Sequence, residues 1–206
     1  MAELGLFPLG AVLLPTERVP LHIFEPRYKE LIGECLAEGR EFGIVLEDAD
    51  GRRDVGTRAA VLEVLRVFDD GRLNILIEGR DRFAILEETA GRAFRTGEID
   101  EVEDASGPPS RDEVDRALRL FGKLLDVAEA DQLDRPSPES RRLSFELGAR
   151  IDMGVKLKQE LLELRSERAR LERLCELMEV AAKGLALEKE VEKRAAQNGR
   201  VTPPPS

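Results

Sequence analysis

Apolar residues change their spacing near residue 104, from the short runs typical of β-strands to the three- and four-residue spacing of helices. Before that point the runs are brief and are interrupted by prolines and glycines, with one helical stretch over residues 26–38. Proline fixes φ and lacks an N–H, so Pro8, Pro15 and Pro20 restrict the flanking segments to short or edge strands. We therefore expect an N-terminal β lobe over residues 1–104 that contains a single helix.

Both ends of the helix over residues 26–38 are marked in the sequence. Pro26 suits the first helical turn, where its missing N–H is no loss, and Gly39 supplies the stop. The apolar residues between them fall at helical spacing and give one face for packing on the strands: Tyr28, Leu31, Ile32, Cys35 and Leu36.

The remainder of the β lobe has the pattern of strands joined by turns, beginning with the short apolar run 42–46. An Asp-Gly pair separates two β-rich runs, 55–68 and 73–86, which is a strong hairpin signal. The first arm is imperfectly periodic, which indicates a bulge. Residues 93–102 form a last, more polar strand, which we expect at an edge of the sheet.

A linker over residues 105–110 separates the two patterns, because the segment is small and polar with consecutive prolines. Ser110 followed by Glu113 matches a capping box, so a helix is expected to begin there. Further helices are predicted from Ser137-Pro138 through Leu147, over residues 156–164, and from a Ser166 cap to residue 198, the last one long. These segments make a helical lobe, 111–198, followed by a disordered tail, 199–206.

The chain resembles the Lon protease N-terminal (substrate-binding) domain family in two motifs, which occur in the same order as in that family. The run LFPLGAVLLPTERVPLHIFEPRYKELI, residues 6–32, resembles the opening of that domain, and residues 55–86 resemble its V-G-T, hairpin and G-x-x-R-F elements. The resemblance extends from residue 4 to about residue 180. It implies an α+β fold in which a PUA-like β pseudobarrel precedes a C-terminal α-helical bundle. It also implies a lobe that engages unfolded or exposed protein segments.

Full-length members of this family continue into an ATPase module and a Ser–Lys protease module. The chain of 206 residues contains no phosphate-binding loop, since Gly122-Lys123 lacks the upstream glycine and the following hydroxyl. It also contains no S-x-x-K or G-x-S-x-G sequence. We therefore expect a stand-alone, non-catalytic member of the family.

Other catalytic sites have few candidates. His22 is the single histidine, and at the junction of a strand and a helix we interpret it as a structural hydrogen-bonding residue. Cys35 and Cys175 lie in apolar helical stripes, so we expect buried free thiols, and one histidine with two buried cysteines does not make a zinc site. No catalytic residue, cofactor or metal is predicted.

The distribution of charge and the hydropathy of the chain exclude some classes of partner. Residues 1–110 hold 13 Lys or Arg against 23 Asp or Glu and so carry the whole net charge of −10. Nucleic-acid affinity depends on basic side chains that neutralise phosphates, so no nucleic-acid partner is expected. No apolar stretch approaches the roughly 20 residues of a membrane helix, and the N-terminus does not resemble a signal peptide. A cytoplasmic protein is therefore expected.

Polypeptide recognition is the function that these observations favour, with unfolded or partly folded polypeptides as partners and a protease or chaperone as a further partner. An extended segment could pair with an exposed strand edge, or apolar side chains could enter a groove between the lobes. Most candidate contact residues are aromatic, and packing in the core is the alternative role for each: Phe7, His22, Phe24, Tyr28, Phe42 and Phe83.

Four further questions stay open at this point. An RNA-binding PUA-like protein would need a clustered basic face, and a small-molecule sensor would need a closed pocket with convergent polar groups. Glu25 and Arg27 could form a local ion pair that fixes the start of the first helix. The outer part of the last helix, 182–196, could be a solvated extension or could pair with another copy, which would make a homodimer.

Overall fold

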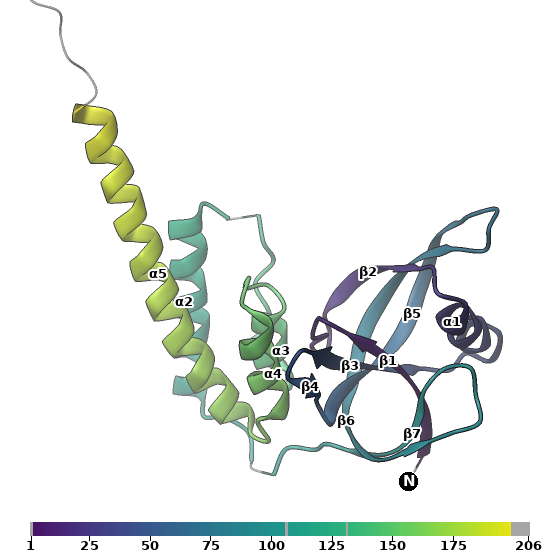
Figure 1. Ribbon diagram of the computed structural model, residues 1–206. Helices are drawn as coiled ribbons and strands as arrows, with labels where there is room; N and C mark the ends of the chain where they lie inside the picture. The colour runs from purple at the N-terminus through teal and green to yellow at the C-terminus, as the bar shows by residue number, and fades with distance from the viewer. Residues whose placement is uncertain (1, 106, 131, 199–206) are drawn as a thin grey trace, which may run out of the picture.

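The computed structural model describes residues 2–105, 107–130 and 132–198, with side chains described as far as Val191 and at Arg194. Strands occupy the first half of the chain and helices the second, and Figure 1 shows the β lobe and the helical lobe side by side. The predicted α+β fold, a β pseudobarrel followed by a helical bundle, is confirmed. The boundaries of the lobes stay a prediction, and the predicted tail lies outside the described residues.

Five strands close the barrel, and two short ones lie beside it. β1 pairs with β7 in antiparallel fashion and with β3 in parallel fashion, so the order β1-β7-β6-β5-β3 returns to β1. The seven strands in the described ranges are β1 (Ala2–Leu9), β2 (Arg18–Ile23), β3 (Phe42–Asp48), β4 (Gly51–Arg52), β5 (Val55–Val67), β6 (Leu73–Thr89) and β7 (Thr96–Glu101).

The prediction of an edge strand over residues 93–102 is wrong. The strand covers Thr96–Glu101 and has a neighbour on each side, β6 and β1, because the N-terminal strand folds back to pair with it. Its polar character comes from alternation: Gly97 and Ile99 are buried, whereas Glu98 and Asp100 are exposed.

β5 and β6 form the predicted hairpin, and its outer part projects on the side away from the helical lobe (Figure 1). The register shifts twice along its outer half, between Val61 and Glu63 and again between Val64 and Arg66, so the expected bulge is confirmed. β2 pairs with the first half of β6, which makes this part a three-stranded sheet.

The barrel core is closed on one side by helix α1 (Pro26–Glu38). Four of the five residues predicted for its buried face are buried, but the prediction for Leu36 is wrong: it lies at the margin of that face and is 44% exposed. Gly39 ends this helix in the left-handed conformation, with φ of 65°. Phe7, Tyr28 and Phe42 meet in this core, where the rings of Phe7 and Tyr28 stack with centroids 4.0 Å apart.

The helical lobe packs α2 (Arg111–Ala128) against the first half of the long α5 (Glu167–Asn198). The Ser110–Glu113 capping box is present, and Ser166 Oγ accepts a hydrogen bond from the Ala169 N–H at 3.3 Å, as a cap of α5 should. The third predicted helix is confirmed as α4 (Val155–Glu163). None of the helices in the described ranges has the length and apolar character needed to cross a membrane.

The helix predicted from Ser137 is much shorter than expected. α3 spans only Leu143–Gly148, and turns precede it. Ser137 Oγ accepts from the Glu139 N–H and Ser140 Oγ accepts from the Arg142 N–H, at 3.3 and 3.1 Å. These serines bind backbone groups that a helix would otherwise use, so the helix begins after them.

A shared hydrophobic cluster joins the two lobes. Phe145 of α3 and Leu162 of α4 pack with Leu46 and with two residues of the β1–β2 loop, Val12 and Leu14. All of these side chains are less than one-tenth exposed. The lobes therefore contact each other through apolar surface as well as through the linker.

Candidate functional site

The largest run of exposed apolar side chains in the β lobe lies on the outer half of β5. We call these residues, together with Phe24, the hairpin surface: Phe24, Leu62, Val64, Leu65 and Val67. Val67 is 66% exposed and Phe24 is 59% exposed. Scattered exposed apolar residues are ordinary, but apolar residues gathered along one strand are typical of an interaction site.

The backbone of this segment is paired on one side only. β3 pairs with β5 at residues 57–59, whereas the outer part, 61–67, pairs with β6 alone in the described structure. A strand edge of this kind offers unpaired N–H and C=O groups to a further strand. The exposed apolar side chains and the free edge therefore coincide.

Aromatic rings stand at the tip of the hairpin surface. His22 stacks on Phe24 and meets Phe68 edge-on, with ring centroids 5.9 Å apart in both pairs. The guanidinium groups of Arg66 and Arg72 lie over the Phe68 ring at 4.5 and 5.1 Å.

The hairpin turn is held against the first helix. Lys29 Nζ of α1 donates to the Asp70 carbonyl oxygen at 2.9 Å, and the Glu25–Arg27 ion pair expected at the helix start is present at 2.8 Å. These contacts hold the tip in place while its apolar side chains remain exposed.

The six residues predicted as contacts fall into two groups. Phe7, Tyr28, Phe42 and Phe83 are at most 6% exposed and pack in the barrel. The first three share one cluster, and Phe83 belongs to another, so no common groove brings the four to the surface.

His22 and Phe24 lie at the surface beside the hairpin. The Nδ1 of His22 is 2.6 Å from Asn74 Oδ1, so the expected hydrogen-bonding role is confirmed. The role of these residues in binding polypeptides stays a prediction.

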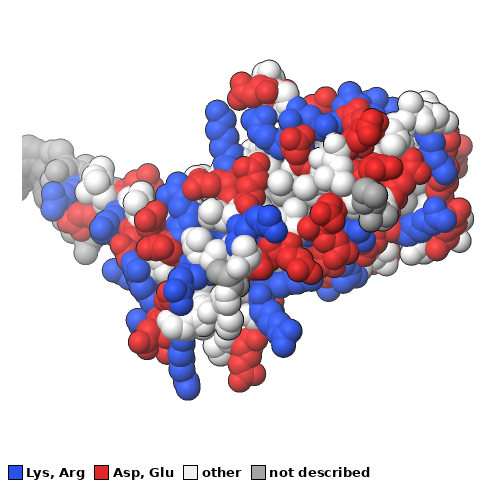
Figure 2. Space-filling view, turned by 90° about the horizontal axis from the view of Figure 1, so that it is seen from below, with Lys and Arg blue, Asp and Glu red and all other residues white. Residues whose placement is uncertain are grey.

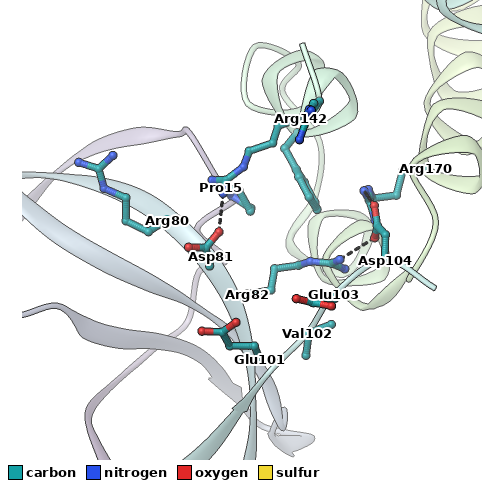
Figure 3. Close-up of a pocket in the computed structure, with 12 residues that line it drawn as sticks. Pro15, Arg80, Asp81, Arg82, Glu101, Val102, Glu103, Asp104, Arg142 and Arg170 are labelled. Carbon is teal, nitrogen blue, oxygen red and sulfur yellow. Dashed lines mark hydrogen bonds and ion pairs between the residues drawn. The ribbon is translucent and has the colours of Figure 1, made fainter. Parts of the chain in front are cut away.

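The space between the lobes is a charged cleft rather than an apolar groove. It has a volume of about 350 Å³ and is lined from both lobes (Figure 3). Arg82 of β6 and Arg170 of α5 both point toward Asp104 at its inner side, and Arg142 forms an ion pair with Asp81 nearer the solvent.

Asp104 holds the two inner arginines together. Its Oδ1 accepts hydrogen bonds from Arg82 and Arg170 at 2.7 Å, and its Oδ2 accepts a second from Arg170 at 2.6 Å. Arg82 also donates to the carbonyl oxygens of Leu162 and Leu164, both at 2.8 Å. The network thus spans both lobes.

Both arginines are almost completely buried, with 5% of the Arg82 side chain and 2% of the Arg170 side chain exposed. Burial tends to raise the pKa of Asp104, but hydrogen bonds and charge from Arg170 and Arg82 outweigh it and hold that pKa below its usual value. Burial and the charge of Arg170 lower the pKa of the Arg82 guanidinium. These charges are satisfied by one another, which is the arrangement of a structural junction.

Other reactive groups offer little chemistry. Cys35 and Cys175 are free and buried, as expected, and burial raises the pKa of the Cys35 thiol to about 11. Such a thiol stays protonated at neutral pH and is a poor nucleophile. Across the described ranges, no three His, Cys, Asp or Glu side chains gather as metal ligands would.

Acidic and basic side chains are mixed on one face of the molecule (Figure 2). Figure 2 shows one face of the molecule on which red and blue atoms alternate across both lobes. The face drawn there has no continuous basic patch of the kind that nucleic-acid binding requires.

Sequence reasoning missed two sets of residues. Leu62, Leu65 and Val67 were assigned to a hairpin arm but not to a surface, although a strand with one buried face needs fewer apolar residues than this arm has. The Asp104 junction was missed as well. Its one signal was that Arg170 falls four residues before Leu174, on the helix face that is otherwise buried.

Known proteins similar to this chain are Lon proteases and their N-terminal domains. The chain is 24% identical over 198 residues to Lon protease 1 of Hydrogenovibrio crunogenus and 26% identical over 218 residues to Lon protease of Flavobacterium johnsoniae. The alignments cover 89% and 93% of this chain but 24% and 26% of those proteins. The chain therefore spans about a quarter of the length of these relatives.

Solved structures share the fold. A Lon N-terminal domain protein from Xanthomonas campestris matches with a TM-score of 0.66 and 25% identity, over 84% of this chain and 97% of that one. The N-terminal domain of Mycobacterium avium complex Lon protease matches with a TM-score of 0.71 and 20% identity, over 86% of this chain and 98% of that one. The family model of the ATP-dependent protease La (LON) substrate-binding domain matches residues 3–180, and the chain belongs to this family.

Proposed function

We propose that this protein is a non-catalytic recognition module that binds unfolded or exposed apolar segments of other polypeptides at the hairpin surface. The family is that of a substrate-binding domain, which supports polypeptides as the ligand class. The observation that carries the proposal is the coincidence of a free strand edge with exposed apolar side chains on residues 61–67 of β5.

Strand addition is the binding mode that this arrangement favours. An extended client segment would pair its backbone with the free edge of β5, and main-chain hydrogen bonds of this kind do not depend on the client sequence. Val64 and Val67 would contact apolar client side chains, and Phe24 would extend the contact beyond the strand. Folded proteins rarely expose such segments, so unfolded clients would be preferred.

The cellular role that we propose is delivery or holding of clients in protein quality control, in the cytoplasm and together with a protease or chaperone. The charged cleft does not suit apolar clients, since it is lined by charged side chains, of which Arg82 and Arg170 pair with Asp104 and Arg142 pairs with Asp81. Binding at the hairpin surface without turnover is the activity to test first.

The experiment is a fluorescence anisotropy titration of a labelled polypeptide that is reduced and carboxymethylated so that it cannot fold. Leu65→Lys and Val67→Lys should each raise the dissociation constant at least about tenfold, which corresponds to about 1.4 kcal/mol. Leu86→Lys is the matched control, because Leu86 is 55% exposed on β6 but lies away from the hairpin tip.

Two outcomes would contradict the proposal. The first is equal binding by the Val67→Lys and Leu86→Lys variants, which would place the contact elsewhere. The second is tighter binding of a labelled structured RNA than of the polypeptide at the same salt concentration, which would favour the alternative of an RNA-binding protein.

A further inference from the structure

A second apolar stripe runs along α5, on the side opposite the one that packs on α2. The buried stripe includes Leu171, Leu174 and Met178. The other stripe recurs at spacings of three and four residues, the a and d pattern of a coiled coil. We call it the outer stripe, and it consists of Leu177, Val180 (70% exposed), Gly184, Leu187 (66% exposed) and Val191 (57% exposed).

The glycine of the outer stripe has no explanation within the chain. A Cβ added at Gly184 would meet nothing within 4 Å, so no neighbour in the described structure requires a glycine there. Glycine in the interior of a helix is destabilising relative to alanine. At a seam position, however, it leaves space for a large side chain from an opposing helix.

We propose that the outer stripe binds the outer stripe of a second copy of this chain, as a short antiparallel pair of helices. With the two-fold axis between Gly184 and Leu187, each Gly184 faces the Leu187 of the other copy. Val180 then faces Val191. Each Gly184 leaves space for the large Leu187 side chain that faces it, and well-packed helix pairs fill space in this way.

Charge complementarity supports the same pairing. Lys183 and Glu190 are seven residues apart and lie on the same side of the outer stripe. In an antiparallel pair of helices, this side of one helix lies next to the same side of the other. Lys183 of each copy would therefore lie beside Glu190 of the other. In the described part of the chain Lys183 forms no ion pair, and Glu190 pairs only with Arg194, one turn further along its own exposed helix surface.

The helical lobe also favours the antiparallel arrangement. Arg173 continues the line of the outer stripe toward the N-terminus, and it pairs with Glu160 of α4 at 2.8 Å. Parallel helices would bring two copies of α4 together at this end. Antiparallel helices place only the last turn of the other α5 beside α4. The part of α5 that carries the outer stripe is accessible to a second helix, because α5 runs well past the end of α2 (Figure 1).

Light scattering after size-exclusion chromatography, over a concentration series of the full chain, tests the proposal. The mass should rise from 23.0 kDa toward twice that value as concentration increases. Leu187→Glu should keep the single-chain mass at every concentration. Leu86→Glu is the matched control, since Leu86 is also exposed, at 55%, but lies on β6, outside both the outer stripe and the hairpin surface, and it should associate like the unaltered protein.

A single-chain mass for the unaltered protein throughout the series would overturn the proposal. So would association of the Leu187→Glu variant with unchanged strength. Circular dichroism spectra that match the unaltered protein would show that each variant is folded, so that a loss of association reports on the outer stripe.

Charge reversal tests which residues meet. Lys183→Glu and Glu190→Lys should each weaken self-association at least tenfold, and an equal mixture of the two variants should regain it, because each then supplies the opposite charge. Recovery with a Glu188→Lys partner instead would mean that the helices are parallel, and the antiparallel proposal would be wrong. No effect of either reversal would also contradict it.

Discussion

Asp104 is the residue on which the junction of the two lobes depends most. It accepts three hydrogen bonds from two arginines that are almost fully buried, and no other carboxylate contacts both of them in the described structure. Removal of one partner from a buried ionic group leaves the remaining charge uncompensated.

Asp104→Asn should therefore lower the free energy of unfolding by roughly 3 kcal/mol at neutral pH. Urea denaturation measures this directly. Asp81→Asn is the control, because the Asp81–Arg142 pair is solvent-exposed and such pairs contribute about 0–1 kcal/mol. Equal effects of the two substitutions would mean that the junction contributes no more than a surface ion pair.

Asp104 also makes the stability of the folded protein depend on pH. The pKa of Asp104 is lower in the folded protein than its ordinary value of 3.8, so the unfolded chain binds its proton more readily. The stabilisation is present above pH 3.8 and is lost as the pH falls through the lower folded value. In the Asp104→Asn variant this part of the loss of stability in acid should be absent. If the stability of the variant fell with pH as that of the unaltered protein does, the pH dependence would not come from Asp104.

Two glycines, Gly79 and Gly33, differ in the space around them. A methyl group at Gly79 would overlap the backbone carbonyl oxygen of Leu14, whereas one at Gly33 of α1 would meet nothing within 4 Å. Gly79→Ala should destabilise the protein by about 1–3 kcal/mol or more. Gly33→Ala should stabilise it by about 0.5–1 kcal/mol, since alanine is the better helix residue. Thermal melting of both variants compares them, and a shift of the same sign in both would contradict this reading.

Among the helices, α2 has a complete capping box at its N-terminus. The Glu113 N–H donates to Ser110 Oγ at 3.4 Å, and the Ser110 N–H donates to the Glu113 carboxylate at 2.7 Å. Ser110→Ala should cost about 1 kcal/mol of stability, because the backbone N–H loses its acceptor. An unfolding midpoint that does not move in chemical denaturation would show that the cap contributes nothing.

Elements with a local signal were predicted well from the sequence. Pro26 and Gly39 bound α1, the Asp-Gly turn gives the β5–β6 hairpin, and Ser110 starts α2. Each depends on contacts between residues close in the chain, which spacing and residue type reveal. The predictions that were wrong involve distant partners or competing local bonds: β7 lies inside the barrel because β1 pairs with it, and serine side chains delay α3.

At the scale of the whole molecule, the two lobes share apolar surface and an ionic network. Phe145 packs in the shared cluster and lies under the guanidinium groups of Arg82 and Arg170, at 5.3 and 4.3 Å from its ring centroid. Phe145→Ala should lower stability by about 3–5 kcal/mol, as buried aromatic truncations do. Differential scanning calorimetry should show one transition for the unaltered chain and an earlier onset for the variant, and an unchanged onset would contradict the coupling.

The candidate site could be predicted only in part, because exposure depends on the complete fold. Phe24 lies on the hairpin surface, but Phe7, Tyr28, Phe42 and Phe83 have the same residue type and are buried. Nothing in the sequence distinguishes an aromatic ring that fills the barrel from one that stands outside it. The hairpin surface also requires that β3 stop pairing with β5 after Ala59, which no local pattern reveals.

Hydrogen–deuterium exchange with and without a saturating unfolded polypeptide tests directly whether polypeptides bind at the hairpin surface. The free edge of β5 should become protected, so we expect slower exchange in peptides that cover residues 61–67 and little change in α2 or α5. Protection centred on the cleft around Arg82 and Asp104, with unchanged exchange along β5, would contradict polypeptide binding at the hairpin surface.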